Sequence, residues 1–160
     1  MEPSQIVILD SAKWSLLEDA AVLPGYGEFV VTVDRLLRDQ HELAVRSDYA
    51  VRLAVVDDLD GIRPFLEIVP TLDVHFPRFT SGTGFSIARI LRQRYRFAGT
   101  LIASGDIRVD QIEFLARCGF DCAVLAKKQL KSRADDRRIV FHQHYQADTS
   151  SDNRWIGGYR

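Results

Sequence analysis

Cysteine is scarce in this chain, whose 160 residues include only Cys118 and Cys122. Two thiols cannot form the multi-bridge framework of a small secreted protein, and three residues separate them where a redox motif has two. An iron–sulfur cluster is also excluded, because it normally needs four thiolates. We therefore predict a cytoplasmic protein with reduced thiols, in which Cys118 fills apolar space near a helix end.

Long hydrophobic runs and an excess of charge are absent too. No apolar stretch approaches the roughly 20 residues that span a bilayer, and Met1–Ser4 lacks the basic start of a signal peptide. The formal net charge of −1 lacks the basic excess that nucleic acid or an anionic membrane attracts. We expect neither a membrane nor a nucleic acid as a partner.

Metal and cofactor signatures are weak. His142 and His144 would share one face of a strand, but only His41 and His75 remain as a third ligand, so a solvated edge is favoured over a metal site. Gly82-x-Gly84 precedes a helix like a dinucleotide loop, yet Ile87 occupies the place of the third glycine. The residues identify no flavin, haem or nicotinamide site, and the cofactor stays unknown.

What the sequence does contain is a series of apolar strands, several of them followed by a loop and an amphipathic helix. This order predicts a single α/β domain with a mainly parallel sheet over residues 1–146. We expect an edge strand near the start and another at 139–145, where a helix end is the alternative. Residues 147–160 are polar and glycine-bearing, which indicates a loosely ordered tail. The expected strands are 5–10, 28–33, 49–56, 72–76, 100–103 and 120–125.

Two polar loops follow the neighbouring strands 72–76 and 100–103. Parallel strands would bring both loops to one edge of the sheet, where α/β folds bind ligands. Arg78 offers a forked cation, and glycine permits close approach of a ligand to the backbone. No lysine or histidine in the second loop forms an obvious acid–base pair with its carboxylates. The candidate ligand-binding residues are Arg78, Gly82, Gly84, Arg89, Asp106, Asp110 and Gln111.

Plainer interpretations of these residues stay open. The glycines would then give the loop conformational freedom, and Asp106 would be a helix N-cap. Alternatively, the helix start near Gly84 would hold a sulfate, phosphate or carboxylate together with Arg78 and Arg89. The arginines from Arg89 to Arg96 would form a solvated helix face or dock an acidic protein partner.

The central block also resembles a bacterial domain-of-unknown-function family, number nine hundred thirty-four. The similarity rests on several short motifs and extends more weakly from about Ile6 to Gln146. Members of this family are described as probable oxidoreductases of sulfite reduction and are often encoded beside the sulfite reductase haemoprotein. The matching motifs are F-P-R-F at 76–79, G-x-G-F-S at 82–86, A-R-x-L-R at 88–92, R-Y-x-F at 94–97, G-D at 105–106, D-Q at 110–111 and R-C-G-F-D at 117–121.

The resemblance implies an auxiliary protein or oxidoreductase of assimilatory sulfite reduction, with the reductase haemoprotein as a partner. Its alternative is a non-catalytic module that binds an anion or docks on the reductase. The family loop usually reads D-G-R-G-Y, whereas this chain has Ser81, Thr83 and Phe85 at the acid, arginine and tyrosine positions. Val109 replaces the arginine that usually precedes D-Q. These departures imply altered affinity if the replaced groups bind the ligand.

Overall fold

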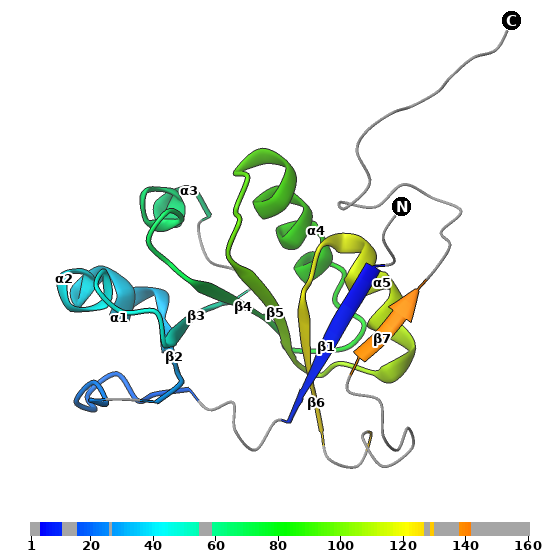
Figure 1. The fold of residues 1–160 in the computed structure, drawn as a ribbon, viewed down its shortest axis with the longest axis horizontal. Helices are drawn as coiled ribbons and strands as arrows, with labels where there is room; N and C mark the ends of the chain where they lie inside the picture. The colour runs from blue at the N-terminus through cyan, green and yellow to red at the C-terminus, as the bar shows by residue number, and fades with distance from the viewer. Residues whose placement is uncertain are drawn as a thin grey trace, which may run out of the picture.

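The computed structural model describes residues 4–10, 16–25, 27–54, 59–126, 129 and 138–141. Strands and helices alternate through most of this part of the chain (Figure 1). The strands are β1 (Ser4–Asp10), β2 (Phe29–Thr32), β3 (Tyr49–Leu53), β4 (Thr71–Phe76), β5 (Thr100–Gly105), β6 (Cys122–Leu125) and β7 (Arg138–Phe141). The α-helices are α1 (Val33–Arg38), α2 (Gln40–Leu43), α3 (Leu59–Ile62), α4 (Thr83–Arg89) and α5 (Ile112–Cys118), and short 3₁₀ or π turns cover 63–65, 90–94 and 109–111.

One sheet has the strand order β2-β3-β4-β5-β6-β1-β7, in which only β7 runs antiparallel. From β2 to β6 each strand lies beside the next one in the sequence. When each new strand is added on the same side of the previous one, right-handed crossover connections place all their helices on one face of the sheet. Figure 1 shows α1 to α5 on the same side of the strands. The α/β class with a mainly parallel sheet is therefore confirmed.

The sheet is curled, and the chain after β1 shows why. Leu16 bridges Val30 of β2, and the Leu17 amide donates to the Val30 carbonyl at 2.7 Å. In a flat sheet Leu16 would lie six strand spacings from β1, about 29 Å. The six residue steps from Asp10 to Leu16 reach at most about 22 Å. The strands must therefore curve toward a barrel, with the helices outside.

The two faces of the sheet differ in composition because side chains alternate along each strand. The outer face carries Leu72, Val74 and Phe76 of β4, which join the helices in the main hydrophobic core. The inner face, opposite to the helices, carries Thr71, Asp73 and His75 of the same strand. We name it the helix-free face. Its members from the other strands are Val7, Leu9, Val30, Thr32, Ala50, Arg52, Thr100, Ile102, Ser104, Cys122 and Val124.

Several boundaries differ from the sequence prediction. The expected edge position of the first strand is wrong, because β1 lies between β6 and β7 and pairs with both. The predicted edge strand at 139–145 is confirmed over its first part as β7, and residues 142–145 lie outside the described residues. The helix α4 begins at Thr83, and a π turn over Ile90–Arg94 ends it before Arg96 takes a positive φ of 56°.

The prediction for Cys118 is confirmed, whereas those for the tail and for two histidines fall outside the described residues. Gly119 ends α5 with a φ of 97°, and Cys118 is buried near this helix end, as predicted. The predicted tail at 147–160 and the histidines His142 and His144 lie outside the described residues. None of the described helices is long and apolar enough to cross a membrane.

Candidate functional site

The loops after β4 and β5 meet, because these two strands are adjacent and parallel in full register. Phe79 lies at the centre of the contact. Its amide donates to Asp106 Oδ2 at 3.0 Å, and its carbonyl accepts from Gln111 Nε2 at 2.8 Å. The Arg108 guanidinium lies 3.5 Å from the centroid of the Phe79 ring. The second loop thus fixes the first in place, and we name this joined region the loop edge.

Two glycines of the loop edge are required by packing. A Cβ on Gly84 would lie 2.4 Å from the Phe76 ring, and one on Gly105 would lie 2.2 Å from the Phe76 carbonyl oxygen. Gly105 also has a φ of +93°, which side chains other than glycine rarely adopt. Gly82, by contrast, has open space where its Cβ would be. Gly84 therefore serves the contact between α4 and Phe76, whatever the loop binds.

Asp106 has a structural role different from the expected N-cap. Arg108 and Gln111 occupy the positions before the 3₁₀ turn and before α5, so Asp106 caps neither. Its carboxylate instead accepts the Phe79 amide of the neighbouring loop. Asp106 is no N-cap because two residues separate it from the 3₁₀ turn, and the Phe79 amide across the sheet edge is a nearer donor.

The remaining candidate residues separate into two groups. Arg78 and Asp110 are exposed at the loop edge, and neither has an ionic partner among the described residues. Arg89 is the last residue of α4. Six helical steps from Thr83 carry it about 9 Å along the axis, away from the loops. The structure therefore brings Arg78, Asp106, Asp110 and Gln111 to one region and separates Arg89 from it.

Charged side chains also lie on the helix-free face, near the middle of the sheet. Arg52 Nε donates to Asp73 Oδ2 at 2.7 Å across β3 and β4. The Asp73 side chain is 0% exposed and that of Arg52 is 20% exposed. The second carboxylate oxygen, Oδ1 of Asp73, has no hydrogen-bond partner in the described part of the chain. A buried carboxylate with one unpaired oxygen is unusual, because desolvation of an unmade hydrogen bond is costly.

Two residues after Asp73, nearer the carboxyl end of β4, His75 lies opposite Ser104 of β5. The His75 Nδ1 and Ser104 Oγ atoms are 3.2 Å apart, and Ser104 is buried. Burial and the positive charge of Arg52 lower the pKa of His75, while Asp73 opposes this shift. The imidazole is therefore neutral near pH 7. Parallel α/β sheets bind their ligands at this end of the strands, although the burial of Ser104 limits its contact with a substrate.

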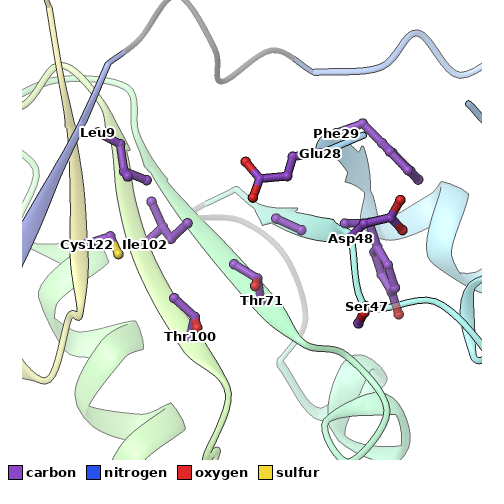
Figure 2. A pocket seen from close by; sticks show the side chains of 11 residues that line it. Leu9, Glu28, Phe29, Ser47, Asp48, Thr71, Thr100, Ile102 and Cys122 are labelled. Carbon is purple, nitrogen blue, oxygen red and sulfur yellow. The ribbon is translucent and has the colours of Figure 1, made fainter. Parts of the chain in front are cut away.

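A cavity of about 230 Å³ lies toward the opposite, amino ends of the strands. Thr71, Thr100, Ile102 and Cys122 line one side of it, and Figure 2 shows the Glu28 carboxylate extending toward the side formed by Leu9 and Ile102. Desolvation, with a smaller contribution from Asp121, raises the pKa of Cys122 to about 11. This thiol is protonated at neutral pH and is a poor nucleophile.

Sequence reasoning missed the helix-free face as a candidate site. The signal was present in T-L-D-V-H-F at 71–76, where polar and apolar residues alternate with the period of a strand. Thr71, Asp73 and His75 therefore had to share one face. Among the described residues no group of three or more His, Cys, Asp or Glu is placed to hold a metal ion.

Comparison with known protein families identifies a bacterial family. The family model described as a bacterial protein of unknown function, DUF934, matches residues 50–155. This range includes β4, β5 and all of β3 except its first residue, and with them the loop edge and most polar residues of the helix-free face. No curated protein matches the chain.

Proposed function

The chain belongs to this bacterial family, DUF934, and on that premise we propose that it is an auxiliary protein of assimilatory sulfite reduction. Its loop edge binds a small oxyanion, for which sulfite is the first candidate. The observation that supports this proposal most strongly is that Arg78 is exposed and has no ionic partner among the described residues. The loop that bears Arg78 is fixed at the next residue, Phe79, by Asp106 and Gln111.

A fixed loop favours binding, because the ligand does not have to order it. Arginine matches the planar, two-oxygen edge of an oxyanion with its forked N–H groups. The position also supports a site, since parallel α/β sheets bind ligands beyond the carboxyl ends of their strands. The resemblance to sulfite-reduction proteins selects sulfite among the oxyanions.

Binding alone fits the loop edge better than catalysis. Asp106 is occupied by the Phe79 amide, and no histidine or lysine lies in the two loops to form an acid–base pair with a carboxylate. Thiol redox chemistry has little support in the two cysteines, one buried and the other with a pKa raised to about 11. We therefore favour a helper of the sulfite reductase haemoprotein, with the oxidoreductase role as second candidate.

The oxidoreductase candidate rests on one observation besides the resemblance. Arg52, Asp73, His75 and Ser104 lie together on three neighbouring strands of the helix-free face. A helper should bind the reductase and show no turnover by itself. An oxidoreductase should consume a reduced electron donor in the presence of sulfite without the reductase.

Two measurements on Arg78→Ala test the proposed site. Sulfite binding to the full chain, followed by calorimetric titration, should weaken at least tenfold, while the melting temperature stays nearly unchanged because Arg78 is exposed. Arg89→Ala is the matched control, since it removes the same charge from α4 outside the loop edge, and it should bind sulfite normally. Equal binding by wild type and Arg78→Ala would remove Arg78 from the site.

The proposed role of the protein in sulfite reduction is tested by deleting its gene in the bacterium. Deletion of the gene should cause a growth requirement that sulfide or cysteine relieves and sulfite does not. Arg78→Ala should fail to complement the deletion, and Arg89→Ala should complement it. Growth of the deletion strain on sulfite as its sulfur source would contradict a role in sulfite reduction.

A further inference from the structure

Arg108 is a second exposed cation at the loop edge. Among the described residues its guanidinium forms no ion pair and donates no hydrogen bond, and it lies over the ring of Phe79. Arg78, the first cation, is the residue that precedes Phe79 in the chain. The positions of both guanidinium groups therefore depend on the same residue, one through its ring and the other through its backbone.

The guanidinium of Arg108 lies flat on the Phe79 ring. Its central carbon is 3.5 Å from the ring centroid, which is close to the contact distance of about 3.5–4.0 Å between two carbon atoms. A guanidinium standing on its edge at this distance would press a nitrogen into the ring. When the two planes are stacked, the N–H groups point outward in the plane of the guanidinium. The ring thus holds the cation and leaves its donors free for a ligand.

Phe79 is fixed on both sides of its backbone. Its amide donates to Asp106 Oδ2 at 3.0 Å, and its carbonyl accepts from Gln111 Nε2 at 2.8 Å. The Phe79 ring therefore extends from a fixed position, and Arg108 is ordered on it before any ligand binds. This ordering lowers the entropic cost of binding, because less freedom is lost when the ligand arrives.

The charges of the loop edge show why one arginine is insufficient there. The exposed carboxylates of Asp106 and Asp110 lie in the same region as Arg78 and repel an anion. Arg108 adds the second positive charge that balances these two negative charges. Because Coulomb attraction scales with the charge of the ligand, an anion with two negative charges gains about twice as much from the two guanidinium groups as a singly charged one.

We propose that Arg108 binds the same anion as Arg78 and that the two arginines select oxyanions with two negative charges. This inference rests on the proposed function of the loop edge as an oxyanion site and names the class of its ligand. Sulfate, hydrogen phosphate and deprotonated sulfite belong to this class, whereas singly charged anions of similar shape bind weakly. Phe79 is the positioning residue, because it places both guanidinium groups.

Two probes of similar shape test the selectivity for charge. Sulfate has two negative charges, whereas methanesulfonate has the same tetrahedral sulfur and only one. Both probes, and sulfite, are titrated calorimetrically into the full chain at constant ionic strength. The wild type should bind sulfate at least tenfold more tightly than methanesulfonate. Arg108→Ala should lose most of this preference with a nearly unchanged melting temperature, because Arg108 is exposed. Arg89→Ala, the control on α4, should keep the preference.

Substitutions of Phe79 test its positioning role. Phe79→Leu keeps an apolar side chain and both backbone hydrogen bonds but removes the ring face, so sulfate binding should weaken severalfold. Phe79→Tyr keeps the ring face and should bind sulfate normally. In the Phe79→Leu background, Arg108→Ala should weaken binding less than it does in the wild type, because the guanidinium is no longer held in place. Equal effects of Arg108→Ala in both backgrounds would contradict the positioning role.

The outcomes separate this inference from the proposed function. If the wild type binds neither sulfite nor sulfate, the oxyanion site itself is wrong, and this inference fails with it. If Arg78→Ala loses sulfite while Arg108→Ala binds sulfite and sulfate like the wild type, the oxyanion site stands and the role of Arg108 is overturned. Equal binding of sulfate and methanesulfonate by the wild type would overturn the selectivity for two charges.

Discussion

The loop edge and the helix-free face use the same kinds of side chain in opposite ways. At the loop edge Arg78 is exposed and unpaired among the described residues, while Asp106 is occupied by a backbone amide. On the helix-free face Arg52 is paired, and Asp73 has the unpaired oxygen. The first arrangement leaves an exposed cation that solvent can reach, whereas the second keeps its unpaired oxygen enclosed within the sheet. The two regions thus differ in exposure more than in the residue types present.

The largest expected difference between the two regions is in stability. Arg52→Ala leaves the buried Asp73 carboxylate without its countercharge, and loss of one partner from a buried pair costs about 3 kcal/mol or more. Arg78→Ala, at an exposed position, should change the free energy of unfolding by less than about 0.5 kcal/mol. Urea denaturation of both variants measures the contrast. Equal losses of stability would show that Arg78 is also structural.

The two glycines before and within α4 provide the next comparison. Gly84→Ala pushes a methyl group into the Phe76 ring, and overpacking of this kind costs about 1–3 kcal/mol. Gly82→Ala meets open space and should stay within about 0.5 kcal/mol of the wild type. Thermal unfolding of the two variants checks this. A destabilised Gly82→Ala together with a normal Gly84→Ala would contradict the packing role.

The departures from the family pattern allow a gain of function at the loop edge. Thr83 is exposed at the start of α4, where the resemblance places an arginine. Thr83→Arg should add a charge-assisted contact to a bound oxyanion, worth about 1 kcal/mol, or roughly fivefold in affinity. Calorimetric titration with sulfite measures it, and Thr83→Gln is the uncharged control. Equal affinity of the two variants would argue against an anion beside α4.

The smallest expected effect is a pH dependence that arises from His75. Its pKa is lowered in the folded protein, so below the ordinary value of 6.5 the unfolded chain takes up a proton more readily. Stability should therefore be fully present above about pH 6.5 and decline as the pH falls through the lowered pKa. His75→Gln should flatten this part of the pH profile of the melting temperature. An unchanged profile would show that His75 makes no contribution.

The sequence predicted the α/β class and the meeting of the two loops because both follow from local patterns. Strand alternation and the order of strands and helices fix neighbours such as β4 and β5. The place of β1 beside β6 could not be predicted, since it joins two strands from opposite ends of the described chain and no local pattern specifies that pairing.

The candidate site was predictable only in part. The location of Arg78, Asp106 and Gln111 followed from two adjacent strands. The partner of Asp106 did not, because an N-cap and a cross-loop acceptor have the same sequence signal. The pairing of Arg52 with Asp73 joins residues 21 positions apart and depends on register, although the alternation around Asp73 already indicated a polar face.

A titration tests the central claim that the exposed Arg78 of the loop edge, and not the buried Arg52–Asp73 pair, holds the oxyanion. Sulfite is titrated into the wild type, Arg78→Ala and Asp73→Asn, with circular dichroism confirming that all three are folded. The account predicts that Arg78→Ala loses sulfite, whereas Asp73→Asn keeps it. Normal sulfite binding by Arg78→Ala, or loss of sulfite in a folded Asp73→Asn, would contradict it.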